Sequence, residues 1–181
     1  DSGIELRVHP TLIPSKRLIA NVEGAMNAVQ VFADAVGTTL YYGKGAGSEP
    51  TASAVIADLV DVVRMQAVEP SKRVPYLAFQ EDKVRDTKVL PIGEVTTSYY
   101  LRLQVQDVKG VLADITRILA DKGISIDAML QREAQEGENQ TDLIILTHET
   151  QEKHMLDAIQ NIEKLSTVIG QATKIRLENL S

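Results

Sequence analysis

The stretch YYLRLQVQDVKGVLADITRILADKGISIDAML, residues 99–130, carries the patterns that decide the fold of the second half of the chain. Apolar and polar side chains alternate over residues 99–105, which is typical of a half-buried β-strand. After a turn at 107–110, apolar residues recur at helical spacing as far as Gly123, which predicts an amphipathic helix. Residues 124–132 return to a strand-like pattern.

The same alternation of patterns continues toward the end of the chain. Residues 141–148 (TDLIILTH) predict a strand, which follows a polar turn at 133–140. Apolar residues at helical spacing over 155–165 predict a second helix, and residues 168–177 predict a last strand. The order β-α-β-β-α-β is that of a ferredoxin-like fold. An edge strand in so small a sheet has unpaired backbone groups, which favours pairing with another copy.

The first half of the chain predicts three or four short strands between residues 4 and 42. Two of them, at 28–32 and 38–42, flank a turn and predict a hairpin. A helix is predicted over residues 50–65. Its apolar stripe consists of Ala52, Val55, Ile56, Leu59, Val60 and Val63.

Residues 66–93 contain three prolines and many charges without a sustained period, which predicts a linker. We therefore expect three parts: a first domain over 1–66, a linker over 67–93 and a second domain over 94–181.

The loop YYGKGAGSEPT, residues 41–51, is the first candidate site. Its glycines at 43, 45 and 47 fit neither the dinucleotide fingerprint nor the phosphate-binding P-loop. Glycine allows a backbone to approach a ligand closely, and the start of a helix attracts negative charge. The alternative is a tight strand-to-helix turn with a solvated lysine at Lys44, and the pattern alone leaves both open.

The turn at 107–110 is the second candidate, because backbone N–H groups at the start of the following helix could hold a carboxylate. Ser125, at the start of the next strand, is a possible polar contact. Two ordinary turns are the alternative explanation.

Composition excludes several classes of function. The chain of 181 residues has 19 basic and 25 acidic residues, a formal net charge of −6 and no basic run, which argues against nucleic acid or an anionic membrane as a partner. It has no cysteine, and none of its three histidines has a ligand partner one helical turn away, so no metal site is predicted. No apolar run approaches the ~20 residues of a membrane span. The start lacks the features of a signal peptide and opens almost directly on a strand, so we expect a piece of a longer protein.

The strings VHPTLIP, VEGAMNAV, DAVG, YYGKGAGSEPTASAVIADLVDV and residues 99–131 together resemble the C-terminal part of homoserine dehydrogenase. Residues 97–176 separately resemble an ACT domain, a module that binds amino acids. The resemblance implies an α+β chain: a partial mixed β-sheet substrate and dimerisation domain with helices, followed by a ferredoxin-like βαββαβ ACT domain. It also implies an NAD(P)-dependent oxidoreductase that interconverts L-homoserine and L-aspartate 4-semialdehyde in the biosynthesis of threonine, methionine and isoleucine.

In that family the glycine loop lies beside the nicotinamide and ribose end of the cofactor. The resemblance therefore implies cofactor contacts by Gly45, Ala46 and Gly47, with Thr51 as a polar contact and Glu49 as a less secure one. The dinucleotide fingerprint and the catalytic lysine of the family lie upstream of this sequence. No catalytic residue is assigned in this chain, which we expect to be inactive alone, and Lys16, Lys44 and Asp58 receive no such role.

The ACT resemblance implies that an effector, threonine, binds between two ACT modules. The enzyme would be a homodimer or homotetramer in the cytoplasm. Threonine binding would move the ACT dimer, and the 66–93 linker would pass this movement on to the substrate domain. The alternatives are a non-catalytic amino-acid sensor and a module that serves only dimerisation. The effector residues implied are Asp107, Val108, Lys109, Gly110, Ile124, Ser125, Ile126 and Gln131.

Overall fold

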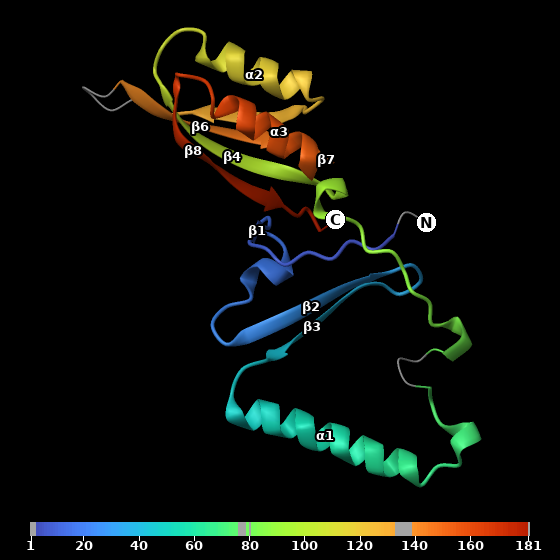
Figure 1. Ribbon diagram of the computed structural model, residues 1–181. Coiled ribbons are helices and arrows are strands. Elements are labelled where there is room, and N and C mark those ends of the chain that lie inside the picture. The colour runs from blue at the N-terminus through green and yellow to red at the C-terminus, as the bar shows by residue number, and fades with distance from the viewer. Residues whose placement is uncertain (1–2, 76–78, 80, 133–138, 181) are drawn as a thin grey trace. The chain divides into compact units, whose positions relative to one another are not determined.

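The computed structural model describes residues 3–75, 79, 81–132 and 139–180 of the chain (Figure 1). The chain forms two compact units, and one of them combines two segments that are far apart in sequence. Unit 1 combines residues 1–14 with residues 87–181, and unit 2 consists of residues 15–86. Unit 2 is thus inserted between two segments of unit 1.

Unit 1 contains the predicted β-α-β-β-α-β order. Its elements are β4 (Thr96–Gln106), α2 (Val111–Asp121), β5 (Ile126–Gln131), β6 (Gln140–Thr147), α3 (Glu152–Ile162) and β8 (Val168–Leu177). The ferredoxin-like prediction is therefore confirmed. Two short strands are added to it, β1 (Thr11–Leu12) and β7 (Thr150–Gln151). Most of the polar turn predicted at 133–140 lies outside the described residues.

The sheet of unit 1 has the strand order β1-β8-β4-β6-β5, and β7 pairs with the start of β4. All neighbouring strands are antiparallel except β1 and β8, which are parallel. Helices α2 and α3 cover one face of the sheet (Figure 1). Strand β5 therefore forms one edge.

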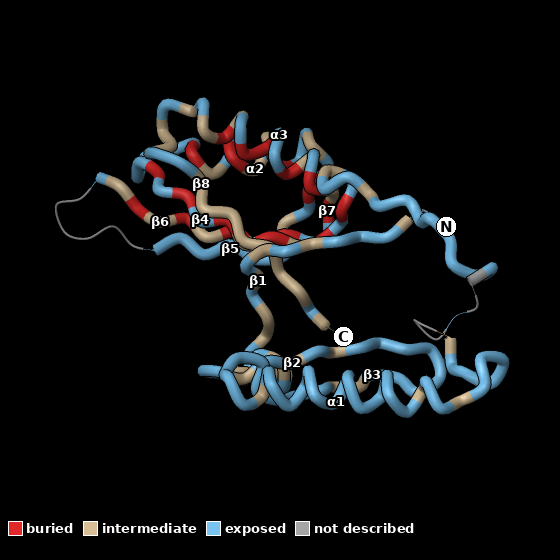
Figure 2. The backbone as a smooth tube through the Cα atoms, turned by 60° about the horizontal axis from the view of Figure 1, so that its bottom comes forward, coloured by how far each residue is buried: buried red, intermediate tan, exposed pale blue. Residues whose placement is uncertain are grey.

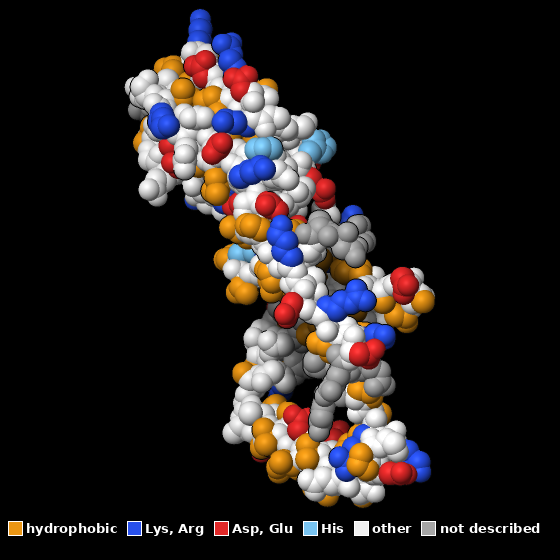
Figure 3. All heavy atoms as spheres, turned by 45° about the vertical axis from the view of Figure 1, so that its right-hand side comes forward, with side chains coloured by type: hydrophobic (Ala, Val, Ile, Leu, Met, Phe, Trp, Pro, Cys, Tyr) orange, Lys and Arg blue, Asp and Glu red, His pale blue; other side chains and the backbone are white. Residues whose placement is uncertain are grey.

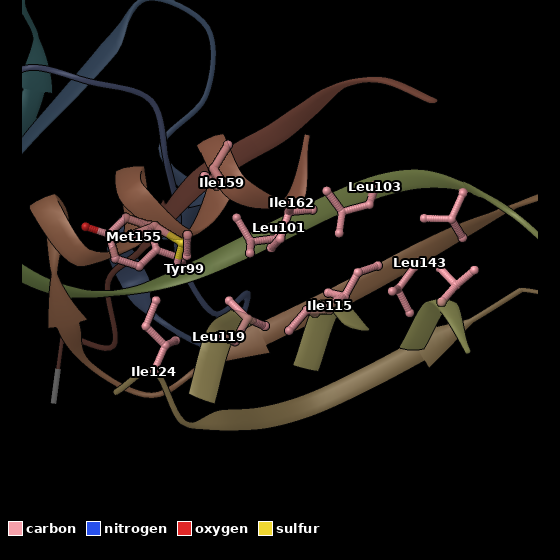
Figure 4. Packing of buried hydrophobic residues seen from close by; sticks show 14 residues of the cluster. Tyr99, Leu101, Leu103, Ile115, Leu119, Ile124, Leu143, Met155, Ile159 and Ile162 are labelled. Carbon is pink, nitrogen blue, oxygen red and sulfur yellow. The ribbon is translucent and has the colours of Figure 1, made fainter. Parts of the chain in front are cut away.

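The core of unit 1 lies between this sheet and its two helices (Figures 2 and 4). Because strand side chains alternate between faces, every second residue of β4 enters the core. The buried core consists of Tyr99, Leu101, Leu103, Val105, Val111, Ile115, Leu119, Ile124, Leu143, Ile145, Met155, Ala158, Ile159 and Ile162.

Residues 3–14, here called the strap, run along unit 1. Ile4 donates its N–H to the carbonyl of Lys88 at 2.9 Å and accepts the N–H of Leu90 at 2.9 Å. Further on, β1 pairs with β8, and the N–H of Glu178 donates to the carbonyl of Leu12 at 3.0 Å. Of the short strands expected from residue 4 onward, this segment thus contains one isolated bridge, between Ile4 and Val89, and the two-residue strand β1.

Unit 2 contains β2 (Met26–Ala33), β3 (Gly37–Lys44) and α1 (Ser48–Gln66). The two strands form the predicted antiparallel hairpin, and Gly37 allows its turn with a φ of 75°. A short 3₁₀ helix, η1 (Leu18–Asn21), precedes β2. Between α1 and β4 the described residues form three short 3₁₀ turns, η2 (Pro70–Lys72), η4 (Glu81–Lys83) and η5 (Ile92–Glu94), and the isolated bridge of Val89 with Ile4.

None of the described residues of unit 2 is buried within this chain. The apolar stripe predicted on α1 is present, but the exposed fractions of its larger side chains run from 41% at Val60 to 65% at Val63. Apolar side chains are visible on the surface of this unit in Figure 3. A helix with a stripe of this kind normally buries it against another element, so unit 2 presents an uncovered apolar surface.

Candidate functional site

The glycine loop of residues 43–47 joins β3 to α1. Gly47 has a φ of 129°, and a Cβ added there would lie 3.2 Å from Pro50 Cδ, so the position requires glycine. A Cβ on Gly45 would lie 2.8 Å from Asn27 Cγ, whereas one on Gly43 would meet nothing within 4 Å. Only Gly47 therefore has a strict local structural reason, because the exposed Asn27 side chain can move away from a Cβ on Gly45.

The predicted cofactor residues Gly45, Ala46, Gly47 and Thr51 lie together at the start of α1, and all are exposed. No side chain caps this helix, and its first backbone hydrogen bond runs from the N–H of Thr51 to the carbonyl of Gly47 at 3.2 Å. The remaining N–H groups of the first turn are free to meet a polar ligand. The loop thus presents free N–H donors to a polar ligand.

The turn at 107–110 is held by its backbone. The N–H of Asp107 donates to the carbonyl of Asn139 at 2.9 Å, and that of Val108 donates to Gln106 at 3.0 Å. Gly110 has a φ of 96° and precedes the first residue of α2. The side chains of Asp107, Val108 and Lys109 are exposed, so they are available to a ligand.

Residues 124–126 lie at the other end of α2. Its 11 residues span about 16 Å, so one copy does not bring residues 124–126 together with the 107–110 turn. The Ile124 side chain is buried in the core, and the carbonyl of Ser125 accepts the N–H of His148 at 2.9 Å. Ile126 is partly buried at the start of β5.

Gln131, by contrast, lies at the same end of the sheet as the 107–110 turn. Strands β4 and β5 are both antiparallel to β6, so they run in the same direction and end on the same side. Gln131 is exposed at the end of edge strand β5. Two neighbours on that strand, Met129 and Leu130, are 45% and 56% exposed.

An open hollow of about 620 Å³ lies next to the same turn. Asp107 and Val108, two of the expected effector residues, line it. The other four lining residues have no signal in the local spacing of the sequence, because only strand pairing brings the end of β4 next to the starts of β6 and β8. These four are Gln106, Asn139, Gln140 and Ile169.

A buried cluster of charges lies at the start of α3, and the sequence analysis did not identify it. Glu152 is 2% exposed. Its Oε2 accepts hydrogen bonds from the Tyr99 hydroxyl at 2.6 Å and from Arg176 Nε at 2.9 Å. Its Oε1 accepts one from Lys174 Nζ. The four residues, here called the Glu152 cluster, come from β4, α3 and β8.

Opposing effects act on the two acids of the Glu152 cluster. Burial raises the pKa of the Glu152 carboxyl, but hydrogen bonds from Lys174 and Tyr99 and the charges of Lys174 and Arg176 outweigh it, so its pKa lies below the ordinary value. Burial, and then the hydrogen bond to Glu152, raise the pKa of Tyr99. The carboxylate is therefore held in its charged form.

The residues that the structure describes contain neither a metal site nor a membrane-spanning helix. Among the described residues, no three His, Asp or Glu side chains lie close enough to hold a metal ion. In the same part of the chain, no helix has the length and apolar character needed to cross a membrane.

Comparison with known proteins first gives the class of unit 1. Residues 99–165 match the sequence model of the ACT domain, in agreement with the ferredoxin-like order. Unit 1 therefore contains an ACT domain.

The rest of the chain then identifies its family. Residues 2–60 match the family model described as homoserine dehydrogenase. The chain is 54% identical over its whole length to a homoserine dehydrogenase of Pseudomonas aeruginosa and 55% identical to one of Methylobacillus glycogenes, and it spans 42% of the length of each. The chain thus corresponds to the C-terminal part of homoserine dehydrogenase, including its ACT domain.

A solved structure agrees with this identification. The crystal structure of a homoserine dehydrogenase from Thiobacillus denitrificans is 62% identical in sequence and has a TM-score of 0.90. The match covers 100% of this chain and 40% of that one. The resemblance drawn from the residues is confirmed.

Proposed function

We propose that this chain is part of an NAD(P)-dependent oxidoreductase that interconverts L-homoserine and L-aspartate 4-semialdehyde, within the biosynthesis of threonine, methionine and isoleucine. The observation that carries the proposal is similarity over the whole chain, above 50% identity, to proteins named homoserine dehydrogenase. We expect the enzyme to be cytoplasmic. The 67–93 segment is its linker, between a substrate domain and the ACT domain.

The glycine loop is the part of this chain that contacts the cofactor. Gly45, Ala46 and Gly47 place exposed backbone next to the uncapped start of α1, and Thr51 adds a hydroxyl on the first turn. The nicotinamide supplies the hydride transfer when it is bound. The role of the loop is to lie against it and help to orient it.

The ACT domain binds an amino acid between two copies. If β5 pairs antiparallel with β5 of a second copy, the start of each β5 lies opposite the end of the other. The 124–126 segment of one copy then meets the 107–110 turn and Gln131 of the other. This pairing brings together two groups of residues that are about 16 Å apart along α2 in one copy. The active form is accordingly a homodimer, or a homotetramer built from such dimers.

Threonine is the effector that we propose for this site. Its ammonium and carboxylate suit Asp107 and the N–H groups at the start of α2, and its hydroxyl suits the Gln131 amide. A site built to bond a hydroxyl rejects valine, because valine would leave the Gln131 amide unpaired once the second copy covers it. Threonine then acts as a feedback inhibitor, with a coupling free energy of about 1–3 kcal/mol.

Two other functions would use the same domain. A non-catalytic amino-acid sensor would need the ACT domain but not the glycine loop. A module that serves only dimerisation would need the β5 edge but no ligand. We favour the enzyme because the match to homoserine dehydrogenase includes residues 2–60, which lie outside the ACT domain.

Calorimetric titration of this chain with L-threonine tests the effector proposal, with L-valine, L-methionine and L-lysine as controls. We expect heat only with threonine, at one or two sites per dimer. No heat with any of the four would leave dimerisation as the role of the ACT domain. Homoserine and NADP added to the chain alone should give no turnover, whereas the full-length enzyme should turn over and be inhibited by threonine.

A further inference from the structure

Arg176 belongs to two different structural groups at once. Its side chain donates to Glu152 Oε2 from Nε at 2.9 Å and also lies 2.8 Å from it through Nη2. Its backbone carbonyl accepts a hydrogen bond from the Thr11 hydroxyl at 3.0 Å, and Arg176 is the pairing partner of Thr11 in the sheet. One residue of β8 therefore joins the Glu152 cluster to the strap.

The Glu152 cluster fixes this part of β8 from the side of the helices. Lys174 and Arg176 are 19% and 15% exposed at the side chain, and both meet a single carboxylate that is 2% exposed. The next residue of β8 is also fixed, because the carbonyl of Leu177 accepts the Thr97 hydroxyl at 3.0 Å. The register and position of the end of β8 therefore depend on contacts made inside the ACT domain.

The strap is weakly bound beyond these contacts. Strand β1 has only two residues, and two-residue strands have little stability of their own. Arg7 adds an ion pair to Glu178 at 3.0 Å, just past the end of β8. The position of strap residues 7–12 therefore depends mainly on their contacts with residues 176–178.

The strap is also a covalent connection to unit 2. It ends at Pro14, and the chain continues at once into residues 15–86. Unit 2 is therefore attached to unit 1 at both ends, through the strap and through residue 87. The linker over 67–93 is one connection out of two.

We propose that the strap is a second connection between the ACT domain and unit 2, and that the Glu152 cluster controls how firmly it is held on β8. A change at the junction of α3 and β8 reaches residue 15 through Arg176 and Thr11. Its use in feedback control rests on the proposed function above. The mechanical link itself does not depend on that function.

Hydrogen exchange of this chain, measured by mass spectrometry on the variant Glu152→Gln, tests the link. The neutral amide cannot satisfy the two cations, so Arg176 loses its fixed position. We expect exchange to rise about tenfold in peptides that cover 10–14 and 177–179, because the local opening free energy of β1 falls. Peptides from β5 and β6 should keep their protection.

Glu163→Gln is the matched control. Glu163 accepts the N–H of Ala172 on β8 at 2.8 Å through one oxygen, and glutamine can still accept it. The control has the same change of charge beside the same strand, and we expect exchange of the strap to be unchanged. A strap that loosened equally in both variants would overturn the proposal.

Thr11→Val keeps the test sharp if Glu152→Gln unfolds the chain. It removes only the hydroxyl that donates to Arg176, so the strap should loosen while the Glu152 cluster and the core keep their protection. Unchanged exchange of the amides of residues 11–13 in this variant would overturn the proposal. The double variant with both Thr11→Val and Glu152→Gln gives a further check. Its increase in strap exchange should differ from the sum of the two single effects, because both contacts act through Arg176, and a simple sum would overturn the proposal. Threonine binding plays no part in these experiments, so their failure is separate from failure of the proposed function.

Discussion

The Tyr99 hydroxyl donates a 2.6 Å hydrogen bond to Glu152, and this bond joins the central strand β4 to the first turn of α3 inside the core. The same carboxylate meets Lys174 and Arg176 from β8. Strand β4 therefore meets the later elements α3 and β8 at one charge. A buried charge is tolerated only when it is paired and hydrogen-bonded, so the fold of the ACT domain depends on keeping this group complete.

Acid should weaken the fold through Glu152. Because the pKa of Glu152 is lower in the folded chain than its ordinary value of 4.5, its contribution to stability is complete above that pH and is lost as the pH falls through the folded-state pKa. Glu152→Gln should lower the free energy of unfolding at pH 7 by about 3 kcal/mol and reduce the loss below pH 4.5. Urea unfolding across this range checks both; an equally steep acid loss in the variant would contradict the assignment.

Removing the Tyr99 hydroxyl should have a smaller effect. Tyr99→Phe leaves the carboxylate with its two cations, so we expect a loss of about 1–2 kcal/mol at pH 7. The pKa of Tyr99 is raised above 10.0, so the native chain should lose stability as the pH rises above that value and the unfolded chain ionises. This alkaline loss should be smaller in Tyr99→Phe. Tyr100→Phe, on the opposite face of β4, serves as the control. This variant should show the same alkaline loss of stability as the native chain.

The core between α2 and the sheet should be sensitive to volume. Leu119 is fully buried, and Leu119→Ala should lower the free energy of unfolding by about 2–5 kcal/mol. Leu156→Ala, at a leucine on α3 that is 41% exposed, should cost about 1 kcal/mol or less. Denaturant unfolding followed by circular dichroism distinguishes them, and equal losses would contradict the core assigned here.

Gly47 and Gly43 should differ, although both lie in the glycine loop. Gly47→Ala places a side chain at a φ of 129° and against Pro50, so the start of α1 should be destabilised by about 1–2 kcal/mol. Gly43→Ala meets nothing within 4 Å and should change little. Hydrogen exchange of the amides in the first turns of α1 measures the difference. Equal exchange in the two variants would show that the backbone conformation of Gly47 is not required.

The exposed edge at β5 should determine association of the ACT domain. Leu130→Lys puts a charge on the strand that we expect to pair between copies, and lysine on an edge strand opposes such pairing. We expect light scattering after size exclusion to show a shift toward monomer, together with weaker binding of threonine. Leu156→Lys adds the same charge on α3 and should leave the dimer intact. A dimer that survives Leu130→Lys would rule out pairing through β5.

The fold of unit 1 could be predicted where the pattern is local. Alternation over residues 99–105 and helical spacing over 111–119 gave the right elements, because each is a property of a short continuous segment. The strap could not be found in this way. Strand β1 joins Thr11 to Arg176, 165 positions apart, and two residues are too few to show a period.

The sites could be predicted only in part for a similar reason. Glycines mark the loop at 43–47 in the sequence, and a turn marks 107–110. The Glu152 cluster gave no signal, because Tyr99 fits an apolar strand face and Glu152 fits an ordinary first helical turn. The helical period of α1 also predicts which side is apolar, but it does not tell what covers that side.

The insertion of unit 2 between residues 14 and 87 has a consequence for cleavage by proteases. A single cut at Arg73, which is exposed, would break the chain into two pieces. The shorter N-terminal piece would still contain residues 3–14, and these are hydrogen-bonded to β8 and to residues 88–90 of the other piece. Because β1 has only two residues and the strap is weakly bound, the two fragments should separate on dilution even without a denaturant.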